Sequence, residues 1–418
     1  MTVMLTAAQE DRQSASIAGL AARGERVGVT RLVLTDFRNY RSARLDLDPG
    51  LDLGPMVLTG ANGAGKTNLL EAMSFLSPGR GLRNARLSDI DRRDTYPADG
   101  SLGRVEASTS SWAVAATVAT RRGPVSIGTG RLGRRDAAEG ERRTIRIDGE
   151  PAKSQAVLGE RLGLLWLTPQ MDRLFVEGPV GRRRLLDRLV LGLDPAHAAR
   201  VARYEQALRE RSRLLRDGSH DPAWLGALEE IMAAEGVAVA AARRDAVERL
   251  DRVCATAEGA FPRARLSLLG TIEGWLGTMP ALDAEERFRA ALAESRASET
   301  LSGGAGLGPH RSDLGVFHAE KGIAAEAAST GEQKALLIAI LLAQARLQRA
   351  VRGEPPLLLL DEVAAHLDAA RRAALFEVLA GLESQTWITG TDPALFAPLG
   401  GVARFLTVRD GALFETSL

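Results

Sequence analysis

The chain has 418 residues, of which 45% are hydrophobic and 26% are charged, and its formal net charge is only +1. This length exceeds what one hydrophobic core usually organises, so two domains, or one domain with a large insertion, are expected. No apolar run reaches the roughly 20 residues that a membrane-spanning helix needs. The first residues lack the basic start and the apolar core of a secretory signal. We therefore expect a cytoplasmic protein without a membrane segment.

Cysteine and lysine are unusually rare in this chain. The single cysteine, Cys254, excludes an intrachain disulfide and a cysteine-based zinc finger, and the five histidines are scattered. Only four of the 54 basic residues are lysines, so 50 are arginines. This bias is typical of a GC-rich genome, so arginine abundance alone does not indicate nucleic-acid binding. A lysine inside a motif carries more weight.

The first third of the chain reads mostly as strands. Residues 1–26 show no steady period and are expected to form a loose tail. VTRLVLTDF, from residue 29, predicts a strand, GPMVLTG a buried strand, and residues 68–76 a helix. Between residues 104 and 147, an antiparallel sheet is predicted by four short β-rich pieces: RVEAST, WAVAATVAT, PVSIGTG and RTIRIDG.

Helical spacing dominates the middle of the chain. Apolar residues recur at helical intervals over residues 196–215, at Trp224, Leu228 and Ile231, and again near Cys254. We interpret residues 171–300 as a mostly helical insertion, a short arm rather than a long coiled-coil rod, since a helix of about 20 residues spans only about 30 Å. Alternating helices and strands then return: a helix at 332–350, a strand at 357–361, a helix at 369–382 and a strand at 386–390.

A phosphate-binding loop is the strongest motif. GANGAGKT matches the P-loop pattern at every fixed position and lies between an apolar strand and an amphipathic helix. Glycines are needed there because backbone N–H groups must close around phosphate oxygens. Lys66 is expected to contact the β- and γ-phosphates of ATP, and Thr67 to bind Mg²⁺. The expected nucleotide contacts are Gly60, Ala61, Asn62, Gly63, Ala64, Gly65, Lys66, Thr67 and Asn68.

A P-loop requires a carboxylate on a neighbouring strand, and LLLLDE at residues 357–362 supplies one. Asp361 is expected to hold the Mg²⁺ shell, and Glu362 to orient or deprotonate the attacking water. Alone, an apolar strand that ends in acids would be a weak signal. The P-loop makes it strong, so Lys66, Asp361 and Glu362 are the expected catalytic residues.

Two stretches compete for the signature loop that reaches ATP in transporter-like ATPases. Such a loop opens the helix that precedes the Asp-Glu strand, and its N-terminus offers backbone donors to the γ-phosphate. That position selects Ser329 and Gly331. LSGG at 301–304 has the familiar letters, but Gly and Pro follow it, so we expect it in a flexible loop. Asp368 is expected to cap the helix at 369–382, and also to lie in the loop that crosses a dimer interface in this class.

Together these segments resemble the RecF family of bacterial recombination mediators over nearly the whole chain after residue 27. The matching segments are DFRNY (36–40), GANGAGKTNLLEAMSFLSPGRGLR (60–83), TPQMDRLFVEGPVGRRRLLD (168–187), GPHRSDL (308–314), STGEQKALL (329–337) and LLLLDEVAAHLD (357–368). The P-loop and the Asp-Glu strand occur in many ATPases, whereas DFRNY, GRRRLLD and GPHR are more specific.

The resemblance implies an α/β fold, an ATPase head like those of SMC proteins and ABC transporters. It would combine a mixed parallel core sheet, an antiparallel β subdomain and an inserted helical arm. The implied segments are a core part at 27–170, the arm at 171–300 and a second core part at 301–418. The implied activity is a slow, DNA-stimulated ATPase whose ATP-driven homodimer binds gapped duplex DNA and single-strand junctions. In DNA replication, repair and the SOS response it would act with RecR and RecO to load RecA.

The family also implies roles for single residues. Ser329 and Gly331 would complete the site of the opposite subunit. Gln170 would lie near a metal-sensing position, and Arg38 and Asn39 would either approach the nucleotide or merely pack against the P-loop. The histidine that often follows the last core strand is missing, so Thr389 or Thr391 would take its place.

DNA contacts are harder to assign. Arg80, Arg83 and Arg86 follow the P-loop helix, and three further arginines stand at 182–184; either set could neutralise phosphates. A solvated face is the plainer interpretation for any one arginine. Asp89 and Asp91 superficially resemble a nuclease metal site that no other feature supports.

Two other functions are compatible with an ATP site. The nucleotide-binding subunit of a membrane transporter should carry a clear LSGGQ and the missing histidine, and should lack so large an arm. A non-hydrolysing, ATP-gated scaffold would not need Glu362. These features favour the DNA-bound ATPase.

Overall fold

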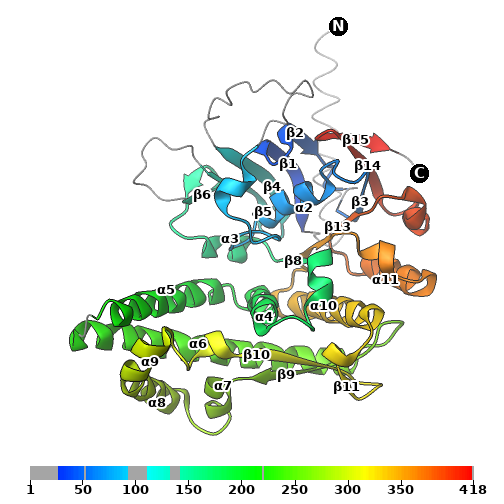
Figure 1. The fold of residues 1–418 in the computed structure, drawn as a ribbon. Coiled ribbons are helices and arrows are strands. Elements are labelled where there is room, and N and C mark those ends of the chain that lie inside the picture. The colour runs from blue at the N-terminus through cyan, green and yellow to red at the C-terminus, as the bar shows by residue number, and fades with distance from the viewer. Residues whose placement is uncertain (1–26, 51–52, 93–110, 132–141, 219–220, 417–418) are drawn as a thin grey trace, which may run out of the picture. The chain divides into compact units, whose positions relative to one another are not determined.

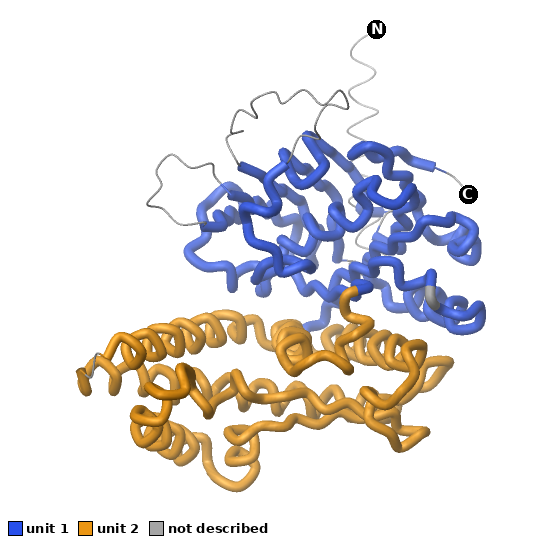
Figure 2. The backbone as a smooth tube through the Cα atoms, in the orientation of Figure 1, with its two compact units in different colours: residues 1–169, 352–418 blue, residues 170–351 orange. Residues whose placement is uncertain are grey.

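The computed structural model describes residues 27–50, 53–92, 111–131, 142–218 and 221–416 (Figure 1). The expected tail at 1–26 and the predicted strand RVEAST lie outside the described residues. The chain divides into two compact units, coloured in Figure 2. Unit 1 comprises residues 1–169 and 352–418, and unit 2 comprises residues 170–351. Unit 1 is therefore built from two separate stretches of chain.

A mixed sheet of six strands forms one half of unit 1. Its order is β15-β14-β3-β13-β12-β8, and all neighbours are parallel except β14 and β15. The strands β3, β12 and β13 are buried throughout, as expected for parallel strands covered on both faces. The bounds are β3 (Pro55–Thr59), β8 (Leu164–Leu167), β12 (Leu357–Leu360), β13 (Thr386–Thr389), β14 (Arg404–Arg409) and β15 (Ala412–Thr416).

An antiparallel sheet forms the other half of unit 1, with the order β2-β1-β4-β5-β6-β7. Its strands alternate between buried and exposed residues, most clearly in WAVAATVAT, where Trp112, Val114, Ala116 and Val118 point to the core. The three described strand predictions are confirmed. The bounds are β1 (Gly28–Phe37), β2 (Tyr40–Asp46), β4 (Trp112–Thr120), β5 (Gly123–Arg131), β6 (Arg143–Ile147) and β7 (Glu150–Pro151).

Unit 1 contains three described α-helices, of which α2 begins within the P-loop motif. The described α-helices of this unit are α2 (Lys66–Ser74), α3 (Ala156–Arg161) and α11 (Ala369–Gly381). At the end of α2, the Phe75 ring meets Phe37 of β1 and Trp112 of β4 at centroid distances of 6.1 and 5.0 Å. This aromatic group joins the P-loop helix to the antiparallel sheet. Short 3₁₀ turns follow at η1 (Leu87–Ile90), η5 (Val363–His366) and η6 (Pro393–Leu399).

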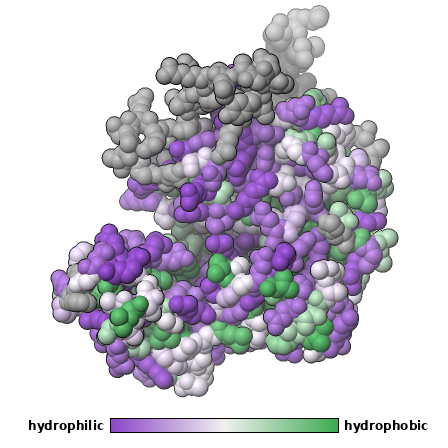
Figure 3. Space-filling view, viewed as in Figure 1, coloured by the Kyte–Doolittle hydropathy of each residue, from purple (hydrophilic) through white to green (hydrophobic). Residues whose placement is uncertain are grey.

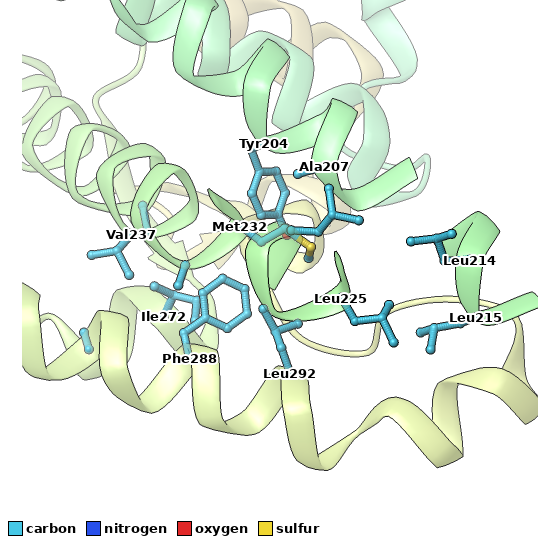
Figure 4. Packing of buried hydrophobic residues seen from close by; sticks show 14 residues of the cluster. Tyr204, Ala207, Leu214, Leu215, Leu225, Met232, Val237, Ile272, Phe288 and Leu292 are labelled. Atoms are coloured by element: carbon cyan, nitrogen blue, oxygen red, sulfur yellow. The ribbon is translucent and has the colours of Figure 1, made fainter. Parts of the chain in front are cut away.

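Unit 2 is mostly helical but also contains a small sheet, β11-β10-β9. Its core lies between α5, α6 and α8: in Figure 4, Met232 lies beside Tyr204, and Ile272 beside Phe288. The elements are η2 (Pro169–Arg173), α4 (Pro179–Leu193), α5 (His197–Arg216), α6 (Pro222–Ala255), β9 (Ala264–Leu269), α7 (Thr271–Trp275), α8 (Ala281–Glu294), α9 (Arg296–Ser302), η3 (Pro309–Arg311), β10 (Asp313–His318), β11 (Ile323–Ala324), η4 (Ala325–Ala327) and α10 (Thr330–Arg352).

The longest helix, α6, corrects the predicted buried face. It has 34 residues, which corresponds to about 51 Å, and it joins two stretches that the sequence pattern treats separately. Leu225, Leu228 and Met232 are buried, whereas Trp224 and Ile231 are 47% and 44% exposed. The helical period was predicted correctly, but Trp224 and Ile231, two of the three residues expected on the apolar face, are not buried in the core.

The predicted boundary after residue 300 does not coincide with the boundary of a compact unit. Strand β9 pairs along its length with β10, which follows that position in the chain, and residues 301–351 belong to unit 2. Half of the LSGG segment, which was expected in a flexible loop, is helical. Leu301 and Ser302 end α9, and Gly303 terminates the helix in the left-handed conformation, with φ at 79°.

Among the described residues, no helix is long and apolar enough to cross a membrane. On the face drawn in Figure 3, hydrophobic side chains form small scattered groups among hydrophilic ones. Such scattering is normal for a protein surface.

Candidate nucleotide site

The carboxyl ends of β3, β12 and β13 bring three separate segments to one edge of the mixed sheet. The strands are parallel and in register, with Leu58 opposite Thr389 and Leu360 opposite Ile388. The P-loop follows β3, the Asp-Glu pair follows β12, and Thr389 ends β13. Ligand sites in open α/β sheets form at this edge. The fold therefore assembles the expected catalytic segments although some 300 residues separate them in the chain.

Two glycines of the P-loop are required by close packing. Gly60 has φ at 144°, and a Cβ there would lie 2.4 Å from the Val408 carbonyl oxygen. Gly65, which caps α2, has φ at 117°, and a Cβ would lie 2.5 Å from Asn39 Nδ2. No other residue could adopt this backbone without displacing its neighbours. Ala61, Asn62 and Gly63 are exposed, so the loop presents its backbone outward.

Lys66 occupies the first turn of α2 and is only 5% exposed. Its Nζ donates to the carbonyl oxygens of Gly60 at 2.8 Å and Ala61 at 3.0 Å. Burial lowers the pKa of Lys66, while the carboxylates of Glu362 and Asp361 oppose that shift. The ammonium group is thus held over the loop, where a phosphate would replace the carbonyl oxygens as its partner.

A chain of hydrogen bonds connects the P-loop, the Asp-Glu pair and the end of β13. Thr67 Oγ1 donates to Asp361 Oδ1 at 3.0 Å, and Thr389 Oγ1 donates to the same oxygen at 2.7 Å. The backbone N–H of Glu362 donates to Thr389 Oγ1 at 2.9 Å. Glu362 itself adopts the left-handed conformation, with φ at 51°, which is costly for a residue with a side chain. Thr389, fully buried, fixes both carboxylate residues.

The oxygen groups of Thr67 and Asp361 suit Mg²⁺. This ion prefers one or two protein carboxylates together with phosphate and water oxygens, rather than an all-protein cage. Burial raises the pKa of Asp361, and the hydrogen bonds from Thr389 and Thr67 counteract it. A cation beside the carboxylate would favour its ionised form further. Over the described residues there is no group of three or more His, Cys, Asp and Glu residues placed to hold a metal ion.

The DFRNY segment contacts the P-loop directly. Asn39 Nδ2 donates to the Ala64 carbonyl oxygen at 3.1 Å, and the Tyr40 hydroxyl donates to that of Gly65 at 3.0 Å. Asn68 Nδ2 donates to Asn39 Oδ1 at 2.7 Å. Tyr40 is fully buried, and burial raises its pKa far above the ordinary value. The turn thus holds the loop and the first turn of α2 in place.

Glu71, a buried carboxylate on α2, organises two arginines near this turn. Arg38 binds both Glu71 oxygens through Nε and Nη2 at 2.9 and 2.7 Å. Arg83 Nη1 donates to Glu71 at 2.8 Å and to Asn68 Oδ1 at 2.7 Å. The side chain of Arg38 therefore binds a carboxylate of its own unit. Sequence reasoning missed Glu71, because it lies opposite the predicted apolar face of this helix, and the helix is buried on nearly all sides.

The structure also places three other residues expected near the site, Asp368, Gln170 and Thr391. Asp368 caps α11 by accepting a hydrogen bond from Arg371 N at 2.8 Å, as predicted. Gln170 is exposed on η2 in unit 2. Thr391 is exposed, so Thr389 alone of the two threonines lies beside the Asp-Glu pair.

The predicted signature begins a helix. Ser329 precedes α10, and Glu332 accepts hydrogen bonds from the Ser329 backbone N–H at 3.0 Å and hydroxyl at 2.9 Å, one half of a capping box. The ion pair with Lys321 and the two bonds from Ser329 hold the pKa of Glu332 at about 2. Ser329 and Gly331 are exposed, and a Cβ at Gly331 would meet nothing within 4 Å. Both residues are in unit 2.

Two of the specific sequence segments, GRRRLLD and GPHRSDL, bind each other in unit 2. Arg182 binds both oxygens of Asp313 at 2.7 and 2.8 Å, and Arg183 donates to the Ser312 carbonyl oxygen at 2.9 Å. Arg243 of α6 binds both oxygens of Asp187 and also the Pro309 carbonyl oxygen. These arginines hold the fold together.

His310 and Arg311 also act within the fold. The Tyr204 hydroxyl and His310 Nδ1 are 2.7 Å apart, and His310 Nε2 lies 3.0 Å from the Ala305 carbonyl oxygen, which also accepts from Arg311. Burial lowers the pKa of His310. The neutral ring therefore donates from Nε2 and accepts from tyrosine at Nδ1.

The supposed nuclease pair, Asp89 and Asp91, is not a metal site. Asp91 forms an ion pair with Arg131, and the Asp89 carbonyl oxygen accepts a hydrogen bond from Arg38. Asp89 lies on η1 and Asp91 follows it, bridged to Phe37 of β1. Both residues belong to the packing beneath the DFRNY turn.

Comparison with known proteins identifies the family of this chain. Residues 28–400 match the family model described as the RecF/RecN/SMC N terminal domain. The DNA replication and repair protein RecF of Rhizobium meliloti (strain 1021) is 48% identical over 388 residues, which cover 92% of this chain and 98% of that protein. RecF of Agrobacterium fabrum (strain C58 / ATCC 33970) is 46% identical over 390 residues, 93% of this chain and 98% of the relative.

A solved structure of the recombination mediator protein RecF with ATP, described as part of the RecFOR pathway, has a similar fold. Its TM-score is 0.77 at 21% identity, and the match covers 94% of this chain and 98% of that one. The agreement extends across both units and identifies the overall fold as an α/β head of the SMC and RecF kind.

Proposed function

Since the chain belongs to the RecF family within the RecF/RecN/SMC group, we propose that it is a DNA-binding ATPase of replication and recombinational repair. ATP binding would drive dimerisation on DNA, and hydrolysis would reset the protein. The observation that carries the proposal is the hydrogen-bond chain from Thr67 through Asp361 and Thr389 to Glu362. It joins a metal-binding pair to a carboxylate that can orient water.

Each catalytic residue has a distinct proposed role. Lys66 would bind the β- and γ-phosphates, and Thr67 and Asp361 would hold Mg²⁺, which neutralises charge on the transferred phosphoryl group. Glu362 would orient the attacking water and accept its proton. The backbone of residues 60–65 and the side chain of Asn68 would surround the phosphates. Arg38 and Asn39 would act by fixing the P-loop, through Glu71 and Ala64 respectively.

The dimer is supported by the form of the signature. Ser329 and Gly331 are exposed at the start of a 23-residue helix, and nothing within this chain requires a glycine at Gly331. An exposed helix N-terminus attracts a phosphate, and a glycine there permits close approach. We propose that these residues complete the ATP site of a second copy and that Asp368 lies at the dimer interface. Gln170 would take the metal-sensing position that the family resemblance implies.

The proposed partners are suggested by the names of the relatives. We propose that the chain binds gapped duplex DNA in the cytoplasm and acts with RecR- and RecO-type proteins to promote RecA loading, in keeping with the DNA replication and repair names of its relatives and the RecFOR pathway of its structural neighbour. The transporter alternative is weaker, because the LSGG letters end a helix and offer no helix N-terminus to ATP.

Two variants test the ATPase cycle. Lys66→Ala should lose ATP binding, whereas Glu362→Gln should bind ATP, lower turnover by at least about 100-fold, and accumulate as an ATP-bound dimer. ATPase rate would be measured against protein concentration, with and without gapped duplex DNA, and mass by light scattering.

The control is Glu415→Gln, an exposed carboxylate paired with Arg404 on the edge strand β15, which should behave like wild type. A Glu362→Gln protein that stays monomeric with ATP would contradict the dimer mechanism. An ATPase rate that no DNA stimulates at any protein concentration would contradict the DNA-dependent cycle.

A further inference from the structure

A basic hollow in unit 1 is separate from the nucleotide site. Its volume is about 860 Å³, and it lies where β6, β7 and the start of α3 meet the segment after α2. We define this basic hollow by its lining: Gly79, Arg80, Arg86, Leu87, Ser88, Arg142, Arg143, Thr144, Ile145, Pro151, Ala152, Lys153, Ser154 and Gln155. Five of the residues are cationic, and the lining contains no carboxylate.

Four of these cations lack an acidic partner in the described part of the chain. Arg80, Arg86, Arg142 and Lys153 are all exposed, and Lys153 is one of only four lysines in the protein. By contrast, Arg83, Arg182 and Arg183, which the sequence equally suggested for DNA, are bonded within the fold. Like charges gathered without counter-charges repel one another, so an anion at the rim would relieve an existing cost.

The fifth cation, Arg143, forms the floor and is rigidly held. Its guanidinium donates to the carbonyl oxygens of Ser77 at 3.1 Å and Gly79 at 2.8 Å, and Nε donates to Thr129 Oγ1 at 2.7 Å. Burial lowers the pKa of Arg143 to about 9, so the group keeps its charge at neutral pH. Its positive charge adds to the field of the hollow without needing a ligand.

We infer that the basic hollow binds the phosphodiester backbone of duplex nucleic acid; this rests on the proposed DNA-binding function and locates one of its contact surfaces. The lining contains serine, threonine and glutamine but no aromatic residue. Stacking of unpaired bases therefore has no platform there, and contacts would be with phosphates, independent of sequence. The hollow is too large for one phosphate ion and has its cations around an open rim, as a passing strand requires.

The hollow is mechanically connected to the ATP site. Arg143 and Gln155 hold the backbone at Gly79, just beyond α2. The nine residues of α2 span about 14 Å, and the P-loop stands at their other end. DNA bound at the hollow would thus contact the segment that α2 joins to the phosphate loop.

The experiment compares salt dependence of binding to a fluorescent gapped duplex, with Mg²⁺ and ATP, for full-length proteins. The double variant Arg142→Ala/Lys153→Ala should reduce the slope of log affinity against log salt by about 2, because roughly 0.9 counterions are released per neutralised phosphate. The matched control is Arg122→Ala/Arg289→Ala, which removes two exposed arginines outside the hollow. The control should keep the wild-type slope, and thermal unfolding should be unchanged in both proteins.

Three outcomes distinguish the nucleic-acid assignment of the hollow from its alternatives. A reduced slope in the hollow variant alone supports the inference. Equal slopes in wild type and the hollow variant overturn it while leaving DNA binding intact, whereas a wild-type protein that binds no DNA overturns the proposed function itself. Titration calorimetry with tripolyphosphate separates the sources of phosphate: a binding event lost in the hollow variant, with the DNA slope unchanged, would assign the hollow to free polyphosphate and refute the nucleic-acid assignment.

Discussion

Thr389 decides how the two catalytic carboxylate residues are oriented. Its hydroxyl both donates to Asp361 and accepts from the Glu362 backbone, and the side chain is fully buried. The fixed letters of the P-loop and the Asp-Glu pair could be predicted from sequence because their backbone geometry and charge demand those residue types. Thr389 was one of two candidates for the missing histidine, and only the register of β13 distinguishes it from Thr391.

Replacing Thr389 by valine should leave ATP affinity nearly unchanged and reduce kcat by roughly 10- to 100-fold, since hydrogen bonds to charged groups contribute about 1.5–3 kcal/mol. Thr389→Ser, which keeps the hydroxyl, should restore most of the rate. Thr391→Val is the matched control and should turn over like wild type. Steady-state ATPase kinetics and nucleotide titration provide kcat and affinity separately. An equal loss in Thr389→Ser and Thr389→Val would show that packing, rather than the hydroxyl, matters.

Tyr40 and Glu71 show why other supporting residues escaped sequence reasoning. The bond from Tyr40 to Gly65 joins residues 25 positions apart, and Glu71 meets Arg38 across 33 positions. No periodicity encodes such pairs, because they depend on how β1 and α2 pack. DFRNY could be identified as a specific segment, but its effect on the P-loop needed coordinates.

At the scale of elements, the periods were predictable and the packing partners were not. The alternation in β4 and the apolar strands β3 and β12 followed the sequence. In α6 the helical period was correct, but choosing its buried face required the positions of α5 and α8. The segments GRRRLLD and GPHRSDL were singled out for specificity, and the structure explains them as an internal network between α4, α6, η3 and β10.

Breaking the network around Asp187 should lower the free energy of unfolding. Burial would raise the pKa of Asp187, but Arg243 and His197 outweigh burial and hold it at about 2. Arg243→Met should lower the free energy of unfolding at pH 7 by up to about 3 kcal/mol, because it removes the bidentate partner of the largely buried Asp187 carboxylate and leaves only His197 beside it. Asp187→Asn/Arg243→Met should recover part of that loss. Urea unfolding followed by circular dichroism gives these values.

Asp187 should lose its stabilising effect at a higher pH in Arg243→Met than in the wild type. The wild-type carboxylate stabilises above the unfolded pKa of about 3.9, and that stabilisation is lost as the pH falls toward 2. In Arg243→Met, burial is opposed only by His197, so the folded pKa rises above the wild-type value. The deficit of the variant should therefore shrink as the pH falls from 7 toward 2. A deficit that grows on acidification would contradict the assignment.

For the whole molecule, the signature and the P-loop belong to different compact units of one chain. Family resemblance predicted that two copies share each ATP site, and no pattern within one chain can test that. Composition predicted a protein of two parts without a membrane span, and the P-loop and Asp-Glu motifs predicted an ATP site. The basic hollow was not predictable, because partnered and unpartnered arginines look alike in sequence.

Complementation tests the shared site. Ser329→Arg should bind ATP but lose hydrolysis, because its signature no longer completes the site of the other copy. Glu362→Gln should also bind ATP without hydrolysing it, because it lacks the carboxylate that orients water. Mixed in equal amounts, they should regain about a quarter of wild-type activity, because half of the random dimers contain one intact composite site. Sites formed within one copy would give no recovery on mixing. Unchanged turnover by Ser329→Arg alone would exclude this serine from the site.

The order of strands in the mixed sheet has a consequence for synthesis. β3 pairs with β13 on one side and β14 on the other, and about 330 residues separate β3 from β13 along the chain. At about 5–20 residues per second, the ribosome takes roughly 15 to 65 s to cover that interval. Throughout it, a mostly apolar strand has both edges unpaired, so the nascent chain needs shelter until nearly its last residues emerge. The proposed nucleotide site can be completed only after β12 and β13 have been synthesised.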